Sequence, residues 1–339
     1  MTDFSTSTVT LHQVAEAAGV SAATVSRILN GTATVSKTKR EAVEKAIAEL
    51  GFRPNPIAQG LARGRSMSIG VLTEAITNPF FMEALKGIED VLQAGGYAPL
   101  FASCDWFAPD EDERLQMLVR RRVDGIILIG GNSPSEHLVN LATHTPLVVF
   151  GRDLSRHGIS SLIFDNEDGA YHATQHLIAM GHRHIAHITG PADHTDSQAR
   201  LAGYQRALAE AKLSFDPQLV VAGDFHEPSG LAAAYQLFSR TDKFTAIFAA
   251  NDQMAYGARL HCYRNHIRVP EDISLIGFDD IPGSLYTTPP LTSVKQPMYE
   301  VGQACAQAMM TILQHQSPAL STLKLHLVAR DSCAAPRNP

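Results

Sequence analysis

Apolar residues in the first fifty positions recur at helical spacing and predict three short helices. Thr10 stands where its side chain can cap the first helix, and the turn Gly19-Val20-Ser21 leads into the second. Ser36 is placed to cap the third helix, which Gly51 closes. Helices over 11–18, 22–29 and 37–50, with a tight glycine turn after the first, are typical of a helix-turn-helix unit.

The chain from residue 53 to residue 65 breaks this pattern. Arg53-Pro54-Asn55-Pro56 does not continue the third helix, because each proline lacks the backbone N–H. Residues 57–63 are too few to form a stable helix alone, and Gly60 weakens helical structure further. We therefore expect a linker that folds only when something holds it.

From Met67 onward, short apolar runs alternate with longer amphipathic stretches, which predicts strands alternating with helices. Continuous apolar runs in this setting indicate parallel strands buried on both faces, and hence an α/β fold with doubly wound parallel sheets. The length suits two such units. The expected strands are 69–72, 126–129, 147–150, 185–188, 219–221, 246–249 and 273–276.

Composition narrows the class of protein. The 339 residues are 45% hydrophobic and 18% charged, which is typical of a globular chain and excludes a disordered protein or a fibre. No apolar stretch is long enough to span a membrane, and residues 1–10 lack the features of a signal peptide, so we expect a cytoplasmic protein without a membrane partner. The scattered cysteines Cys104, Cys262, Cys305 and Cys333 are expected to be free thiols.

Charge is divided unevenly along the chain. Residues 1–65 carry a net charge of about +3, whereas the remaining residues carry about −9. A body of this sign repels nucleic acid, so any contact with DNA must be made by the N-terminal segment.

The strongest functional signal is VAEAAGVSAATVSRILNG at residues 14–31. A recognition helix presents its first turn to base edges and keeps its apolar side for the domain core, so we expect Ala22, Ala23 and Arg27 on the exposed face. Arg27 can donate two hydrogen bonds to a guanine, whereas the alanines can only contact thymine methyl groups. The alternative is a small helical cap on the body. Short donors suited to phosphate oxygens are Ser21, Thr24, Ser26 and Asn30.

This motif and the following VSKTKREAVEKAIAELGFRPNPIAQGLARGRS resemble the lactose-repressor/galactose-repressor (LacI/GalR) family of bacterial transcription regulators. The likeness continues through IGVL, NPFF, VDGIIL, GHRHIAHITGP, RLAGYQRAL, TAIFAANDQMAYGA, VPEDISLIGFDD and PPLTSVKQP, so it covers nearly the whole chain. It implies a periplasmic-binding-protein-like body. The expected organisation is a helix-turn-helix domain at 1–54, a hinge segment at 55–65 and a body at 66–339, with an N-subdomain over about 66–163 plus 294–322 and a C-subdomain over about 164–293 plus 323–335.

The resemblance implies that Ala22, Ala23 and Arg27 read the major groove of double-stranded DNA. It also implies that a paired hinge helix inserts Leu61, with Ala58 beside it, into the minor groove, where an apolar wedge kinks the duplex. An ordinary linker anchor is the alternative for Leu61. The expected DNA contacts are Thr10, Ser21, Ala22, Ala23, Thr24, Ser26, Arg27, Asn30, Ser36, Ala58 and Leu61.

The resemblance further implies that a small effector, most simply a sugar or sugar derivative, binds between the two subdomains. A guanidinium, a carboxylate, an amide and a flat ring together suit the hydroxyls and the face of a sugar. A buried structural ion pair is the alternative for Arg200 and Asp279, and a helix cap is the alternative for Asn251. Arg152 stands where it could favour an acidic group. The expected effector contacts are Asn78, Phe80, Asp165, Arg200, Phe225, Asn251, Asp279 and Gln296.

The function expected from these features is that of a homodimeric repressor on a pseudo-palindromic operator, because a two-fold dimer requires a two-fold site. The chain stops at Pro339 without a heptad segment, which favours a dimer over a tetramer. We expect that binding of the effector releases the protein from DNA. The opposite effect, co-repression, in which the effector strengthens DNA binding, is equally allowed by the physics.

No enzyme, metal or cofactor is expected. His182, His184 and His187 have no carboxylate or cysteine partner at metal-binding spacing, and no nucleotide loop or nucleophile motif occurs. Two other classes of protein remain as alternatives, a soluble sugar-binding protein and a sugar-processing enzyme on the same α/β frame. Neither accounts for the helix-turn-helix segment.

Overall fold

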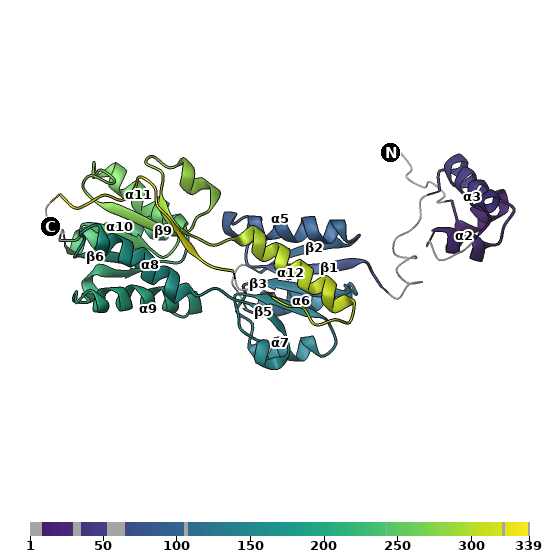
Figure 1. Ribbon diagram of the computed structural model, residues 1–339, viewed down its shortest axis with the longest axis horizontal. Coiled ribbons are helices and arrows are strands. Elements are labelled where there is room, and N and C mark those ends of the chain that lie inside the picture. The colour runs from purple at the N-terminus through teal and green to yellow at the C-terminus, as the bar shows by residue number, and fades with distance from the viewer. Residues whose placement is uncertain are drawn as a thin grey trace. The chain divides into compact units, whose positions relative to one another are not determined.

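The computed structural model describes residues 9–29, 35–52, 65–104, 108–241, 243–320 and 323–337. Asn30, Ala58 and Leu61 lie outside the described residues, as does the whole predicted hinge segment apart from Arg65. The chain divides into two compact units, the first extending to Ser68 and the second holding most of the remainder. We call described residues 9–52 the head and the described residues from 69 onward the body, and we treat each by itself (Figure 1).

The head consists of three helices, α1 (Leu11–Ala17), α2 (Ala22–Leu29) and α3 (Lys37–Leu50). Thr10 caps α1 as predicted. Its hydroxyl accepts a hydrogen bond from the Gln13 N–H, and the Gln13 side chain accepts one from the Thr10 N–H at 2.8 Å. This reciprocal capping box satisfies backbone donors that the first turn of a helix cannot pair internally.

The remaining predicted caps of the head have different outcomes. The Ser21 hydroxyl accepts from the Thr24 N–H at 3.2 Å, so it caps α2. Ser36 stands at the N-cap of α3, but its side chain makes no capping hydrogen bond. Gly51 ends α3 in the left-handed conformation at φ +63°, which glycine adopts without steric cost.

One valine from each helix fills the centre of the head. Val14, Val25 and Val43 are fully buried, and Ala23 is exposed on α2 as predicted. The expected exposure of Ala22 is wrong, because this residue is half-buried and packs against the same core. A residue at the first position of α2 lies close enough to the neighbouring helices to lose part of its solvent contact.

The body contains a five-stranded sheet in the order β2-β1-β3-β4-β5, with parallel pairing of β1 with β3, β3 with β4 and β4 with β5. Leu118 lies against Gly70 and Met309 lies against Gly125, two glycines on opposite faces of the sheet, so α6 and α12 cover opposite faces. We call this sheet and its helices the N-subdomain. Its elements are β1 (Ser68–Thr73), α5 (Pro79–Ala94), β2 (Ala98–Ser103), α6 (Ala108–Arg120), β3 (Gly125–Ile129), α7 (Ser135–Ala142), β4 (Leu147–Phe150), β5 (Ser160–Leu162) and α12 (Met298–Leu313).

A six-stranded sheet in the order β11-β10-β9-β8-β6-β7 forms the C-subdomain (Figure 1). Its pairings are parallel except for β10 with β11. Ile247 packs in the core under α10 and α11, and its neighbour Phe248 packs in the core under α8 and α9, so one helix pair covers each face. The elements are α8 (Asn166–Ala179), β6 (Ile185–Thr189), α9 (Thr195–Glu210), β7 (Val220–Ala222), α10 (Glu227–Arg240), β8 (Ala246–Ala249), α11 (Asp252–Arg264), β9 (Ser274–Asp279), β10 (Thr292–Lys295) and β11 (His326–Val328).

Each of the seven predicted strands coincides with or overlaps a strand of the body. Apolar runs in the sequence do not predict four further strands, β2, β5, β10 and β11. Three of them stand at sheet edges, where side chains stay partly exposed, and the fourth, β10, reads Thr-Ser-Val-Lys. The expected crossing of the chain between subdomains at residue 294 falls inside β10, whereas β10 belongs to the six-stranded sheet up to its last residue, Lys295.

Two smaller expectations concern the cysteines and membrane-spanning helices. All four cysteines are buried free thiols. Among the helices formed by described residues, none is both long enough and apolar enough to cross a bilayer.

The helix pairs of the body approach each other through glycine. A Cβ on Gly302 of α12 would stand 2.0 Å from the Ala84 carbonyl oxygen of α5. Gly203 of α9 and Gly257 of α11 have the same relation to carbonyl oxygens of α8 and α10. No side chain fits at such distances from a rigid backbone atom, so these glycines set the spacing between the paired helices.

We predict that Gly302→Ala lowers the free energy of unfolding by about 2–3 kcal/mol, because the new methyl group forces α5 and α12 apart. The same exchange at an open helical position stabilises a protein by about 1 kcal/mol, so a loss is diagnostic of the contact. Urea denaturation followed by circular dichroism measures it. Gln307→Ala, on an exposed position of the same helix, is the control and should change stability by less than about 0.5 kcal/mol. An unchanged or raised stability of Gly302→Ala would contradict the contact.

Candidate DNA-binding face and effector cleft

The exposed side of α2 carries the polar groups expected to meet DNA. The exposed Arg27 donates from Nε to the Ala23 carbonyl oxygen at 3.2 Å, which holds its stem along the helix. The Ser21 and Thr24 hydroxyls lie 2.9 Å apart and hydrogen-bond each other. A guanidinium and a pair of hydroxyls on one helix face suit the acceptors of base edges and phosphates.

Other expected contacts of the head are placed less favourably. Thr10 uses its hydroxyl in the cap of α1, Ser26 is half-buried on α2, and Ser36 is exposed before α3. The first two therefore need a change of rotamer or a close approach to offer a hydrogen bond to DNA.

Six of the eight expected effector contacts surround one small cavity of about 40 Å³ in the body. Asn78 and Phe80, at the start of α5, come from the N-subdomain. The others come from the C-subdomain and follow the carboxyl ends of β7, β8 and β9 or lie on α9, which is the edge where parallel sheets bind ligands. They are Arg200, Phe225, Asn251 and Asp279.

Arg200 is the most connected of these residues, and it is only 4% exposed. Its Nε donates to the Asn166 side chain at 2.9 Å, and Nη1 donates to the Ala250 carbonyl oxygen. Nη1 also lies 3.6 Å from the Asp279 carboxylate, and the guanidinium stacks 3.9 Å from the centre of the Phe278 ring. Arg200 and Asp279 therefore form the buried structural ion pair that was the alternative interpretation of the sequence, and both residues still border the cavity.

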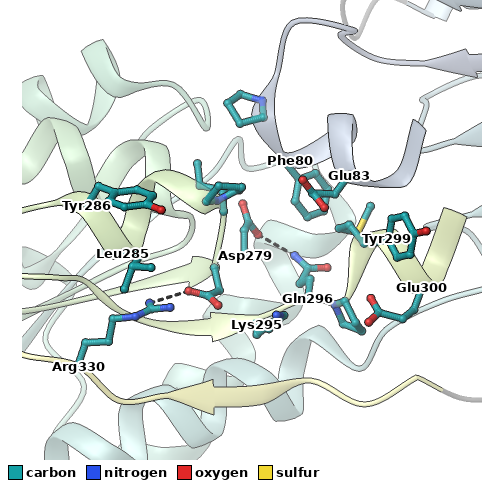
Figure 2. A pocket seen from close by; sticks show the side chains of 16 residues that line it. Phe80, Glu83, Asp279, Leu285, Tyr286, Lys295, Gln296, Tyr299, Glu300 and Arg330 are labelled. Carbon is teal, nitrogen blue, oxygen red and sulfur yellow. Dashed lines mark hydrogen bonds and ion pairs between the residues drawn. The ribbon is translucent and has the colours of Figure 1, made fainter. Parts of the chain in front are cut away.

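Asp279 ends β9 at φ +106°, a conformation that L-residues rarely adopt. Its Oδ1 accepts a hydrogen bond from Nε2 of Gln296 at 2.7 Å, as Figure 2 shows. Burial raises the pKa of Asp279 to about 7, although Arg200 and Gln296 both favour the charged form. The carboxyl group of Asp279 therefore titrates near neutral pH.

Phe225 and Asn251 are joined by a hydrogen bond. The Asn251 amide donates to the Phe225 carbonyl oxygen at 2.8 Å and accepts from the Met254 N–H at 2.9 Å, so Asn251 is the N-cap of α11. Phe225 has a positive φ of +70°, and its ring fills the space that a Cβ on Gly190 would need. The helix-cap alternative for Asn251 thus describes its bonds here, while the side chain also borders the cavity.

Gln296 and Asp165 do not line the small cavity. Gln296 lines a neighbouring pocket of about 450 Å³, which Phe80 and Asp279 also border (Figure 2). Asp165 caps α8 by accepting from the Asp168 N–H, and it lines a hollow of about 880 Å³. Asp196 borders both that hollow and the small cavity, so the small cavity shares lining residues with each of the two larger spaces.

Besides Phe81, three residues that line the cavity were not predicted from the sequence. His194 is the N-cap of α9, and its ring meets the Phe225 ring edge to face at 5.3 Å. Burial lowers the pKa of His194, so this ring is neutral at neutral pH. Asp196 and Gln253 complete the wall. All three stand at or just after a helix start beside the sheet edge, a position that apolar periodicity does not single out.

Two of the three histidines discounted as metal ligands have other partners. His182 hydrogen-bonds the Thr245 side chain and the Ala334 carbonyl oxygen. His187 bonds the Phe248 carbonyl oxygen, and burial lowers its pKa to about 4. No group of three or more potential metal ligands occurs within the described ranges.

Comparison with known proteins gives two family matches and relatives that cover most of the chain. Residues 10–55 match the model of bacterial regulatory proteins of the lacI family, and residues 174–333 match that of the periplasmic binding protein-like domain. Catabolite control protein A of Priestia megaterium is 35% identical over 94% of this chain and 96% of its own length.

Two solved structures resemble the whole described fold. The lac repressor dimer bound to operator and the anti-inducer ONPF has a TM-score of 0.87 at 32% identity, covering 96% of this chain and 99% of that one. The complex of the transcriptional regulator CelR with cellobiose has a TM-score of 0.71 at 33% identity, with the same coverage. The architecture expected from the sequence, an N-terminal helix-turn-helix head followed along the chain by an α/β body, is confirmed.

The raised pKa of Asp279 predicts a pH-dependent stability. An unfolded aspartate titrates near pH 3.9, so between about pH 4 and pH 7 the folded protein holds a proton that the unfolded chain has released. The contribution of Asp279 is therefore most favourable below pH 4 and declines as the pH rises to 7. Asp279→Asn should remove a decline of roughly 4 kcal/mol from denaturation curves compared across this window.

Asp272→Asn is the matched control for this titration. The Arg268 side chain lowers the pKa of the exposed Asp272 to about 2, so its stabilisation is lost only as the pH falls below about 4. Its effect has the opposite sign and lies outside the window of Asp279. If the free energy of unfolding changes equally with pH between pH 4 and 7 in the wild type and in Asp279→Asn, the raised pKa of Asp279 is contradicted.

Proposed function

The chain belongs to the lacI family of bacterial regulatory proteins and is a transcriptional regulator of that family, and we propose that it is a repressor released from its operator by a small effector. One observation carries the proposal. A head with an exposed donor face on its second helix is joined in one chain to a body whose Arg200 and Asp279 border a cavity between two subdomains.

The proposed DNA contact is made by α2 of a homodimer. Arg27 on the exposed helix face supplies a fork that pairs with guanine, and the Ser21 and Thr24 hydroxyls suit phosphates. Two identical heads related by two-fold symmetry read a pseudo-palindromic site. The dimeric lac repressor on its operator supports this arrangement by similarity.

The proposed effector is a carbohydrate that binds where Arg200, Phe225 and Asp279 converge. The carboxylate and guanidinium offer paired bonds to hydroxyls, and the Phe225 ring offers an apolar face. The cavity of about 40 Å³ holds only a few water molecules, whereas small-ligand pockets begin at about 300 Å³. A sugar therefore has to move the two walls apart to enter.

This requirement gives the effector a means of control. A ligand shifts a conformational equilibrium only by its difference in affinity between the states. A sugar that needs a widened cavity binds the widened arrangement of the subdomains selectively, and we propose that this arrangement supports DNA binding less well. Co-repression is the opposite effect, in which the effector strengthens DNA binding. An effector that raises the affinity of the protein for its operator would establish it.

We predict that Arg27→Ala reduces affinity for an operator selected from a randomised duplex library by roughly 10- to 100-fold, the range of one bidentate contact with a base. Effector binding, followed by calorimetry, should stay unchanged because the substitution lies in the head. Fluorescence anisotropy with operator and scrambled duplex at a fixed salt concentration provides the measurement. Equal affinity of the wild type for both duplexes would refute the regulatory function.

Asp279→Ala is predicted to abolish release of DNA by the effector while operator affinity stays within about twofold, because the carboxylate borders the cavity and not the head. The same anisotropy assay is titrated with an effector found by thermal-shift screening, since a bound ligand raises the melting temperature by mass action. Asp272→Ala removes an exposed carboxylate from the same subdomain and should respond normally. A normal response of Asp279→Ala would remove this residue from the effector site.

A further inference from the structure

The backbone is strained at the end of β9, where the chain passes the small cavity. Asp279, the last residue of β9, has a φ of +106°, and Asp280 has a φ of +53°. Residues other than glycine keep such conformations only where surrounding contacts over-determine them, and they gather at ligand-binding sites. The Asp279 carboxylate borders the cavity and lies 3.6 Å from Nη1 of Arg200. The strain therefore falls on a residue of the proposed effector site.

One buried carboxyl group holds both N–H groups that follow Asp279. We call residues 279–281 the turn. The Ile281 N–H donates directly to Oδ2 of Asp252 at 3.0 Å. The Asp280 N–H donates to the Ser293 hydroxyl at 3.1 Å, and this hydroxyl donates to Oδ1 of Asp252 at 2.6 Å. Each oxygen of Asp252 thus fixes one peptide group of the turn, one directly and one through Ser293.

The segment after β10 holds the other side of the turn. The Gln296 N–H donates to the Asp279 carbonyl oxygen at 3.1 Å, and its side chain donates to the Asp279 carboxylate at 2.7 Å (Figure 2). The conformation of Asp279 is therefore determined by groups from α11 and from β10 with its following residue, against the preference of its own backbone.

Asp252 is fully buried, although the cap of α11 does not require it. Asn251 supplies that cap by accepting from the Met254 N–H. Burial raises the pKa of Asp252, and the charge of Asp279 raises it further. Apolar side chains would join α11 to β10 without this desolvation. A carboxyl group is instead suited to fixing two N–H groups in directions that the local backbone opposes.

We propose that Asp252, acting in part through Ser293, is a positioning residue for the effector site, a role that rests on the proposed function. Its bonds hold Asp279 at positive φ, and this conformation directs the Asp279 carboxylate toward Arg200 and the cavity. Without them the turn relaxes toward negative φ and the carboxylate leaves the cavity wall. Asp252 does not itself line the cavity, so it acts through Asp279.

Ser293→Ala tests this role, and Ser332→Ala is its matched control. Both serines are fully buried. The Ser332 hydroxyl accepts from the Thr292 N–H at 2.8 Å and donates to the Leu275 carbonyl oxygen at 2.6 Å, so each serine makes one accepted and one donated bond beside β9 and β10. These bonds of Ser332 involve neither Asp252 nor the turn. If Ser293 only stabilises the fold, the two variants should behave alike.

The titration of Asp279 reports the position of its carboxyl group without any ligand. Burial raises its pKa to about 7, so stability declines as the pH rises from about 4 to 7. Among the groups that face the carboxylate, Arg200 and Gln296 favour its charged form and Asp196 opposes it. A carboxyl group that leaves the cavity wall regains solvent, and its pKa returns toward the ordinary value.

Ser293→Ala should therefore remove roughly half or more of this decline, and Ser332→Ala should leave it as in the wild type. Urea denaturation at intervals between about pH 4 and pH 7 provides the measurement. Equal declines in both variants and in the wild type would overturn the proposal, because Ser293 would then contribute stability without placing Asp279.

A double-mutant cycle separates Asp279 from Asp252. The bond from the Ser293 hydroxyl lowers the pKa of Asp252, so Ser293→Ala acts on that titration as well. Both serine variants are therefore repeated in the Asp279→Asn background. An effect that arises at Asp252 persists in this background, whereas an effect that arises at Asp279 disappears. A reduction of the decline that is equal in both backgrounds would overturn the proposal.

Binding is measured by calorimetry of the full-length protein with glucose, galactose, ribose, cellobiose and adenosine as probes. A probe that binds the wild type should bind Ser293→Ala and Asp252→Asn roughly tenfold or more weakly, the range of one lost hydrogen bond to a charged group. Ser332→Ala should stay within about twofold of the wild type. A probe that binds Ser293→Ala as tightly as the wild type would overturn the positioning role.

Specific DNA binding is measured on the same preparations, so that the positioning role and the proposed function can fail separately. If Ser293→Ala loses the pH-dependent decline but the wild type prefers no duplex over scrambled sequence, the positioning role stands and the regulatory function is wrong. If a probe releases the operator equally well from the wild type and from Ser293→Ala, the regulatory function stands and the positioning role is wrong.

Discussion

A buried guanidinium organises the C-subdomain. Arg200 is almost inaccessible to solvent, so each of its donors and its charge must be satisfied within the protein. Asn166 from α8, the carbonyl oxygen of Ala250 after β8 and the carboxylate of Asp279 after β9 meet this demand together. One side chain on α9 thereby fixes the relative position of a helix and two strand ends. The same carboxylate borders the proposed effector site, so structural and binding roles share one pair.

A second carboxyl group secures the remaining edge of that subdomain. Asp252, at the first position of α11, is fully buried and accepts hydrogen bonds from the Ile281 N–H and from the hydroxyls of Ser284 and Ser293. These bonds join α11 to the segment after β9 and to β10. Gly277 makes room for the carboxylate, because a Cβ there would stand 2.1 Å from its Oδ1. The strand ends that carry the cavity residues are thus held by polar bonds as well as by apolar packing.

The sequence predicts those features of the structure that local patterns of residues determine. Apolar spacing and capping residues fix the bounds of α2 and α3, and uninterrupted apolar runs identify the buried strands. It does not predict features decided by distant contacts. Ala22 is half-buried because other helices approach it, β10 pairs despite a polar sequence, and Asp165 caps a helix in a hollow separate from six other expected contacts. His194 and Asp196 join the cavity through the fold alone, with no motif of their own.

The geometry of the cleft connects ligand chemistry with control. Phe80 and Phe225 border the small cavity, which shares Phe80 and Asp279 with one larger pocket and Asp196 with another. On the proposed function, a ligand gains its polar contacts only after the walls separate, so part of its binding free energy is used to move the subdomains. Because glycine contacts fix the helix pairs within each subdomain, the proposed motion is carried by the segments between the sheets rather than by the sheets themselves. In this proposal, rigid subdomains and a cavity too small for a sugar together convert the binding of a small molecule into a displacement of one sheet relative to the other.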